Sequence, residues 1–333
     1  MVGETEDLRP VPAQNVFKKL KTPQFLWPAL IIAIVGLVIL VLATRPQSQL
    51  QIKAHEDKFK VDFFLKGKDR AKAEKFLEKL LLPQSVLEGQ EFELDSTSSA
   101  KLAFASPVVL NLKFKTGNIS FSGTSHIPLY DASLPTPTGS KIPTTASIIL
   151  YGQDFKPIIT KEANQTEFGA WLEDNLSSQN GQYLMLFDEG FALKFKPQKP
   201  LDLVKLQEIK SPSEPLYKQE TVTDTIVHLV KISTEEQETW AIYQIGDWVL
   251  LASSFDIAKS VLALELGEAP YINFPKTDQN VSLVIYFRDQ EVANPNSLSL
   301  ITTNSQKLTK YLDNIKEAVI VLDGEKISGY IDF

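Results

Sequence analysis

Hydrophobic residues gather in one uninterrupted run near the N-terminus of this 333-residue chain. No charged side chain occurs between Thr22 and Thr44, and the stretch contains the letters FLWPALIIAIVGLVILVLA. A helix needs roughly 20 such residues to cross a bilayer core, because lipid offers backbone amides no other partner. The pattern therefore predicts a transmembrane helix at residues 25–44, preceded by a tail at residues 1–24.

Basic residues near this run predict its orientation. Lys18, Lys19 and Lys21 crowd the N-terminal flank, whereas only Arg45 adjoins the other flank. Because basic flanks stay in the cytoplasm, we expect a cytoplasmic tail, a single-pass anchor in the cell membrane and an extracytoplasmic body. The segment Val-Leu-Ala at 41–43 resembles a cleavage site, so a cleaved leader peptide is the alternative.

The first part of the body, residues 45–127, predicts strands and one helix. The polar stretch at residues 46–57 suggests a short stalk. A strand follows at residues 59–66, and an apolar stripe at helical spacing predicts a helix at residues 68–82. Further strands are predicted at residues 92–95, 101–105, 108–115 and 118–123, the last two joined by a turn at Thr116-Gly117.

Proline, serine and threonine then concentrate at residues 128–146, which predicts a linker or a long ordered loop. The second domain, residues 147–333, alternates strands, helices and hairpins. Strands are predicted at residues 147–151, 225–232 and 281–287, and helices at residues 166–176, from Ser253 to Gly267, and 305–315. Hairpins are predicted at residues 183–196, 240–253 and 317–333.

The three hairpins resemble one another, since each has an apolar strand, an acidic or glycine turn and an alternating strand. Such similarity suggests internal repetition, although ordinary hairpins share these features. Hairpins joined by single helices predict an α+β fold, in which antiparallel sheets carry helices packed on one face.

One stretch resembles a known family. The residues WAIYQIGDWVLLASSFDIAK, from Trp240 to Lys259, are similar to a strand–turn–strand–helix unit of an uncharacterised bacterial family of single-pass, membrane-anchored envelope proteins. The C-terminal letters LDGEKISGYIDF resemble that family's closing hairpin. The resemblance covers residues 147–333 and implies an architecture and a location, but no site residues.

Composition narrows the function classes. The chain has no cysteine, which excludes disulfides, thiolate metal sites and a cysteine nucleophile. The net charge is −7, and the first 44 residues carry +1, so the remainder carries −8. An acidic body disfavours nucleic acid as a partner, because phosphate backbones bind to basic surfaces.

No motif supplies a catalytic residue, a cofactor-binding loop or a metal site. The three histidines, His55, His126 and His228, are far apart, and no glycine-rich phosphate loop occurs. Paired carboxylates such as Glu173/Asp174 fall at predicted surface positions, where solvated acids are common. The most plausible ligand surface comprises Trp248, Asp247 and Tyr243, because Trp248 directly follows a turn; packing in the core is the alternative interpretation. The oligomeric state is left open.

Our leading hypothesis is a non-enzymatic, membrane-anchored protein that binds or scaffolds an envelope protein or a cell-wall polymer. One alternative is a membrane-tethered hydrolase or transferase that uses carboxylates or a serine with His126 or His228. Another is a single-pass sensor or regulator whose tail recruits a cytoplasmic partner.

Overall fold

The computed structural model describes residues 48–55, 58–65, 67–79, 90–93, 108–115, 117–124, 134, 140–163, 167–178, 181–209, 217–231, 239–275, 281–288 and 315–333. The predicted tail and transmembrane helix lie outside these residues, as do the strand at 101–105 and nearly all of the helix at 305–315. Within the described part of the chain, no helix has the length and apolarity needed to span a bilayer.

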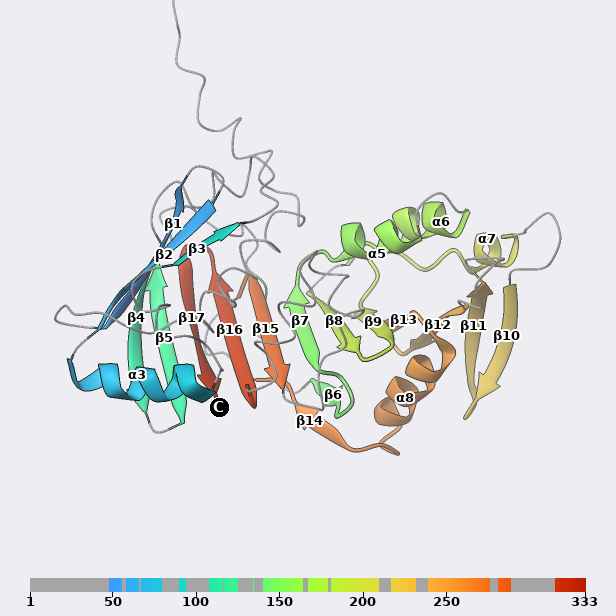
Figure 1. The fold of residues 1–333 in the computed structure, drawn as a ribbon. Coiled ribbons are helices and arrows are strands. Elements are labelled where there is room, and N and C mark those ends of the chain that lie inside the picture. The colour runs from blue at the N-terminus through green and yellow to red at the C-terminus, as the bar shows by residue number, and fades with distance from the viewer. Residues whose placement is uncertain are drawn as a thin grey trace, which may run out of the picture.

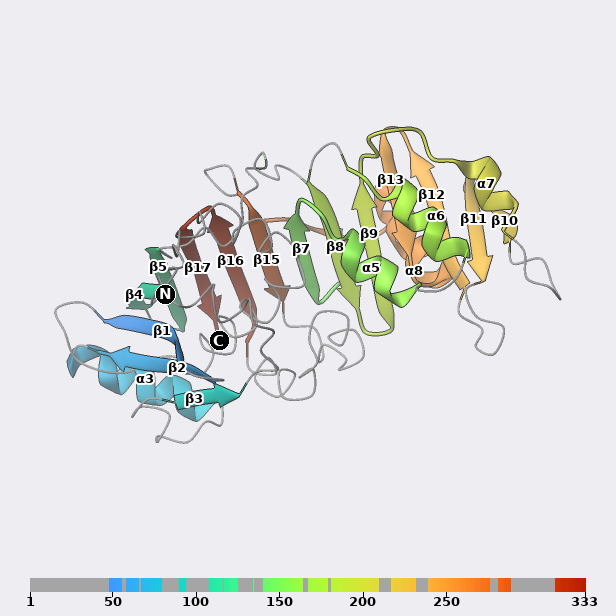
Figure 2. The same cartoon turned by 90° about the horizontal axis from the view of Figure 1, so that it is seen from above.

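The described residues form an α+β structure, as predicted, built on one antiparallel sheet of fifteen strands (Figures 1 and 2). The strand order is β10-β11-β12-β13-β9-β8-β7-β15-β16-β17-β5-β4-β1-β2-β3, and a second sheet pairs β14 with β6. The strands of the large sheet are β1 (Gln49–His55), β2 (Lys58–Phe64), β3 (Gln90–Glu93), β4 (Val108–Lys115), β5 (Asn118–Thr124), β7 (Ile148–Gly152), β8 (Gln182–Phe187), β9 (Gly190–Phe195), β10 (Tyr217–Val222), β11 (Thr225–Lys231), β12 (Thr239–Ile245), β13 (Trp248–Ala252), β15 (Leu283–Arg288), β16 (Glu317–Asp323) and β17 (Lys326–Asp332).

The helices are α3 (Gly67–Lys79), α5 (Lys156–Glu162), α6 (Glu167–Asn175), α7 (Leu203–Gln207) and α8 (Phe255–Glu265), and the small sheet comprises β6 (Lys141–Pro143) and β14 (Tyr271–Asn273). The apolar stripe of α6 predicts its packing correctly, since Phe168, Trp171 and Leu172 are all buried. The helix after Ser253 forms as predicted, but Ser254 is its N-cap, accepting a hydrogen bond from the Ile257 amide at 3.2 Å.

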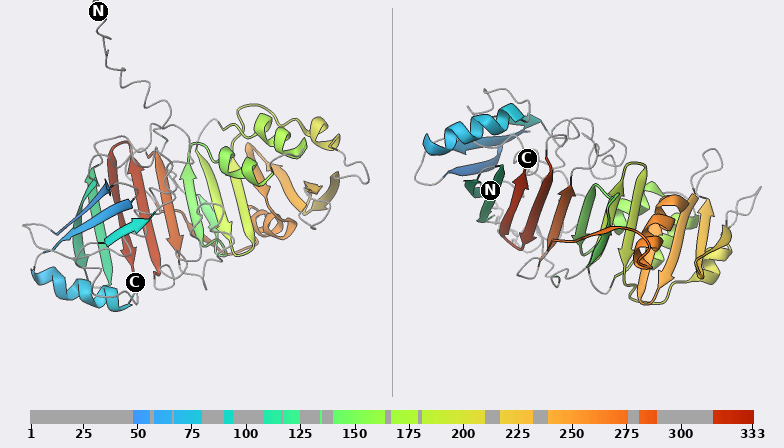
Figure 3. Two further views of the ribbon diagram at one scale, coloured as in Figure 1. Left: turned by 45° about the horizontal axis from the view of Figure 1, so that its top comes forward. Right: turned by 90° about the horizontal axis from the view of Figure 1, so that it is seen from below.

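The expectation that helices cover one face of the sheet is wrong. Helix α6 packs on the face that carries Leu184 and Leu186, whereas α8 packs on the opposite face, beside Met185. Figures 1 and 3 show α5, α6 and α7 on one side of the strands and α8 on the other. The reason lies in the central strands: β7 and β8 are apolar at every position apart from Gly152 and Gln182, so both of their faces must be covered.

The predicted stalk is also wrong where the structure describes it. Residues Gln49–His55 form strand β1, which pairs with both β2 and β4. The physical reason is an alternation of polar and apolar residues, in which Leu50 and Ile52 lie opposite the inward-facing Leu110 and Val108. A polar composition therefore concealed a strand with one apolar face.

Residues from both predicted segments contribute to the same sheet. Strand β5 of the first segment pairs along its whole length with β17, the last strand of the chain. Of the stretch predicted as a linker or long loop, Leu134 bridges to Val281 and β6 pairs with β14.

The strand order has an approximate two-fold relation centred on the β7–β15 pair, where Leu150 lies opposite Ile285. Next to each central strand lies the hairpin that follows it in the chain, β8–β9 on one side and β16–β17 on the other. The pairs β13–β12 and β5–β4 come next. Of the three similar hairpins, β8–β9 and β16–β17 thus occupy equivalent places in the sheet, whereas β12–β13 occupies a different place.

Candidate functional site

One face of the sheet is exposed and polar in the half that contains β2, β1, β4, β5 and β17. Across five neighbouring strands a single row of residues runs Phe64, Gln49, Asn111, Ser122 and Ser328, each directly opposite the next. Ser122 and Ser328 are exposed, and the other three are partly exposed. The row carries no charge, which is unusual, because exposed positions are commonly Lys, Glu, Asp or Arg.

A second row runs beside the first and is uncharged at its centre. Gln51 lies opposite Val109, which lies opposite Thr124. Charged residues stand only at its ends, where Asp62 pairs with Gln51 and Lys326 with Thr124. We call the uncharged residues of the two rows the polar strip; they present amide and hydroxyl groups beside the apolar side chains of Phe64 and Val109. The exposed Lys113, two positions along β4 from Asn111, borders the first row on its other side.

The strip is held in place by an apolar face on the other side of the same strands. In β4, Val108, Leu110, Leu112 and Phe114 are buried, whereas the residues between them point to the opposite side. A slip of one residue would exchange these two sets, so burial of the apolar set fixes the register and hence the position of each polar side chain.

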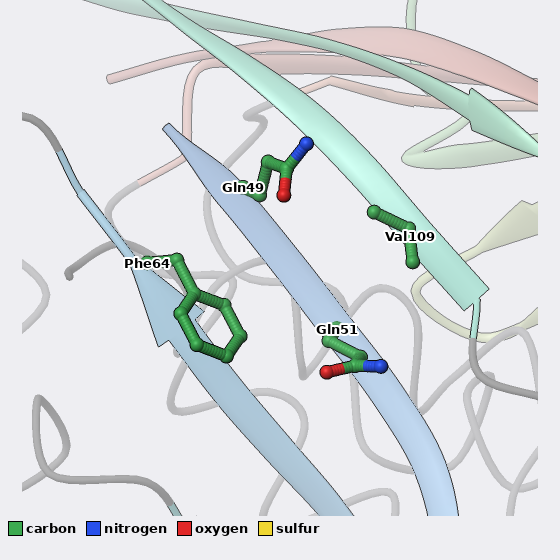
Figure 4. Close-up of a pocket in the computed structure, with 4 residues that line it drawn as sticks. All are labelled: Gln49, Gln51, Phe64 and Val109. Atoms are coloured by element: carbon green, nitrogen blue, oxygen red, sulfur yellow. The ribbon is translucent and has the colours of Figure 1, made fainter. Parts of the chain in front are cut away.

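A small pocket lies at the β2 end of the polar strip. It is lined by Gln49, Gln51, Phe64 and Val109, and its volume is about 150 Å³. Figure 4 shows these side chains on three neighbouring strands, with the two glutamine amides between Phe64 and Val109. The Gln49 side-chain amide donates a hydrogen bond to the side-chain oxygen Oδ1 of Asn111 at 3.1 Å, which orients the Gln49 amide along the strip.

The same face of the sheet is buried and aromatic in the other half, which begins at β7. The first row continues through Val321 and Val284 into Tyr151 and Tyr183. The rings of Tyr151 and Tyr183 lie 4.8 Å apart between centroids, and burial together with the neighbouring Tyr183 raises the pKa of Tyr151 to about 12. This half therefore has the character of a core, whereas the polar strip has that of a surface.

Of the predicted ligand surface, Trp248 and Asp247 lie beside two lysines. The ammonium nitrogens of Lys194 and Lys196 lie 5.0 and 5.3 Å from the centroid of the Trp248 ring. Lys196 also pairs with Asp247 at 3.1 Å, and Lys194 with Glu265 at 2.5 Å. The chain's own cations thus occupy positions over the indole ring, where a ligand would have to displace them.

Tyr243, the third predicted residue, lies on the same face but is buried, with 2% of its surface exposed. Burial, and secondarily the charge of Glu265, raises its pKa far above the ordinary value. Its hydroxyl has no hydrogen-bond partner among the described residues. The arrangement places Tyr243 in the core rather than at a surface beside Trp248.

The candidates for chemistry are separate from one another where the structure describes them. His228 is buried in β11, its Nδ1 lies 2.6 Å from the Tyr217 hydroxyl, and burial lowers its pKa. Glu173 and Asp174 pair with Lys156 and Lys205 at 2.7 and 2.8 Å, on the surface. His126 lies outside the described residues.

Comparison of the chain with family models, with curated proteins and with solved structures found no match. The sequence pattern does not predict the pocket, because its residues come from three different strands. Two of these residues, Gln49 and Gln51, lie in the stretch interpreted as a stalk. The alternation Gln-Leu-Gln-Ile at residues 49–52 was the signal that could have revealed it.

Proposed function

We propose that this chain is a single-pass membrane protein whose extracytoplasmic body binds or scaffolds a component of the bacterial cell envelope without catalysing a reaction. The uncharged stretch from Thr22 to Thr44 and the basic residues before it support the anchor and its orientation.

The polar strip with its pocket is the main observation that supports a binding function. Apart from Phe64, where β2 pairs with β1 alone, its side chains project from stretches of strand that are paired on both sides, so the backbone that presents them is rigid. A binding surface needs such fixed donors and acceptors, because ordering them on association would cost affinity. An open polar face on a rigid sheet is suited to binding and scaffolding.

The distance along the chain constrains where the ligand would be met. Gln49, in the pocket, comes only five positions after Thr44, at the end of the proposed anchor. An extended chain spans at most about 3.6 Å per residue, so this pocket would lie within roughly 18 Å of the end of the anchor. The proposed ligand is therefore an envelope component close to the membrane surface.

Fractionation and protease accessibility test the placement. We expect the full-length chain with a C-terminal tag to sediment with membranes, to resist carbonate extraction and to dissolve in detergent. In spheroplasts, added protease should remove the tag. A variant lacking residues 25–44 serves as the control and should leave the membrane fraction. Recovery of the intact chain in the supernatant, or a tag protected from protease, would overturn the proposal.

A further inference from the structure

We propose that the polar strip binds a glycan chain of N-acetylated amino sugars, with one acetamido group seated in the pocket formed by Gln49, Gln51, Phe64 and Val109. This inference depends on the proposed function only for the location of the ligand, outside the cytoplasm and close to the membrane. The residues of the strip alone determine the chemistry of the ligand.

The size of the pocket decides which part of a ligand it holds. A volume of about 150 Å³ is well below the roughly 300–1,000 Å³ of sites that enclose a whole small molecule. The pocket therefore suits one substituent of a larger ligand. The remainder of that ligand must lie outside the pocket, where the open polar strip adjoins it.

The chemistry of the pocket matches an acetamido substituent. Each glutamine amide both donates and accepts hydrogen bonds, as does the N–H and C=O pair of an acetamido group. Phe64 and Val109 supply apolar surface for the methyl group. A substituent with polar and apolar parts is thus better matched than a hydroxyl, which would leave the apolar surface unused.

The neutrality of the strip points to an uncharged chain. Between Asp62 and Lys326, which stand at the two ends of the second row, the strip presents the amides of Gln49, Gln51 and Asn111 and the hydroxyls of Ser122, Thr124 and Ser328. An anionic polymer would require a row of Lys or Arg, and an acidic peptide would require the same. Neutral amides and hydroxyls bind the hydroxyls of sugars without desolvating a charge.

The extent of the strip favours a chain over a single sugar. It crosses β2, β1, β4, β5 and β17, which are consecutive in the sheet. With neighbouring strands about 4.8 Å apart, the strip is about 19 Å wide. A chain lying across the strands would contact several of these side chains at once, whereas a monosaccharide would reach only those at the pocket.

Calorimetric titration of the detergent-solubilised full chain tests the ligand class. The probes are chitohexaose, whose sugars carry acetamido groups, and cellohexaose, which has hydroxyls at the same positions. We expect binding of chitohexaose, at least tenfold weaker binding of N-acetylglucosamine, and no measurable binding of cellohexaose. Affinity for chitohexaose should hardly change between 50 and 300 mM salt, because no charges pair. Equal binding of the two hexaoses, or none of either, would overturn the proposal.

A substitution then locates the site. Gln51→Leu keeps the size of the side chain but removes its hydrogen bonds, so we expect about tenfold weaker binding of chitohexaose. The matched control is Gln244→Leu, which removes an exposed amide from β12 in the other half of the sheet and should leave affinity unchanged. Circular dichroism verifies folding of both variants. If Gln51→Leu is folded and binds as tightly as the parent chain, the pocket is not the site.

The two proposals fail in different ways. If chitohexaose does not bind but the tagged chain is membrane-embedded with its C-terminus outside, only the glycan inference is lost. If chitohexaose binds and Gln51→Leu weakens it, yet the chain fractionates as a soluble protein, only the proposed placement is lost.

Discussion

Tyr151 and Tyr286 occupy equivalent positions on either side of the junction between β7 and β15, and both contact the same ring. Their ring centroids lie 6.3 and 6.1 Å from that of Phe274, which follows β14. Each tyrosine comes directly after the residue at the centre of the approximate two-fold relation, Leu150 or Ile285. Phe274 thus packs on the line where the two halves of the sheet meet.

Replacing Phe274 by alanine should destabilise both halves together. Phe274 is 1% exposed, and removing a buried phenylalanine side chain costs about 3–5 kcal/mol of unfolding free energy. Urea denaturation of the detergent-solubilised chain, followed by tryptophan fluorescence, provides the measurement. Tyr271→Ala is the matched control, because this aromatic residue of β14 is 47% exposed and should change stability by less than about 1 kcal/mol. Similar losses for both variants would contradict this role of Phe274.

Gly329→Ala should be far more damaging than Gly67→Ala. A Cβ at Gly329 would lie 2.0 Å from the Val319 carbonyl oxygen and 2.5 Å from the Phe121 ring, so β16, β17 or the ring must shift. We expect a loss of about 1–3 kcal/mol in unfolding free energy. At Gly67, the first residue of α3, an added Cβ meets nothing within 4 Å, and the change should stay within about 0.5 kcal/mol. Thermal unfolding of the two variants side by side distinguishes them, and equal melting temperatures would argue against this packing.

The N-terminus of α8 should be sensitive to Ser254. The Ser254 hydroxyl accepts a hydrogen bond from the Ile257 amide, so Ser254→Ala should cost about 1 kcal/mol, while Ser254→Asp keeps an acceptor and should retain stability. Ser253 has a different role, because its hydroxyl accepts from the Phe191 amide at 2.8 Å. Urea midpoints of the two Ser254 variants provide the test. If aspartate fails to restore what alanine removes, capping is not the reason.

Stability should fall in mild acid because of His228. Burial lowers the pKa of this histidine in the folded state, so the unfolded chain binds the extra proton more readily. Neutral His228 therefore makes its full contribution to the free energy of unfolding above about pH 6.5, the ordinary pKa of histidine. This contribution decreases as the pH falls below that value. Urea midpoints at pH 5.5 and 7.5 measure the effect, which His228→Gln should reduce. If the stability of His228→Gln depended on pH as strongly as that of the parent chain, groups other than His228 would cause the effect.

The sequence predicted those elements whose pattern is local. The stripe of Phe168, Trp171 and Leu172 marks one face of a single helix, and Gly324 marks a tight turn, with a φ of 55° that favours glycine. Such features depend on residues close together in the chain, so a single pattern suffices to identify them.

Features that depend on distant residues were missed. Gln51 and Val109 meet only because β1 pairs with β4, and no turn or motif connects these strands. The position of α8 likewise depends on the apolar residues of both faces of β8 and β13, not on the helix itself. Tyr243 was placed beside Trp248 at a surface because the two are near in sequence, although its side chain is buried.

The pairing of β5 with β17 has a consequence for biogenesis. A polypeptide delivered N-terminus first presents β5, at Asn118–Thr124, long before β17, its neighbour in the sheet at Lys326–Asp332, has been made. Until then β5 has an unpaired edge, which invites association with other chains. Premature termination before the last hairpin would leave that edge permanently open, so shortened products of this gene should aggregate or be degraded rather than persist as a partly functional protein.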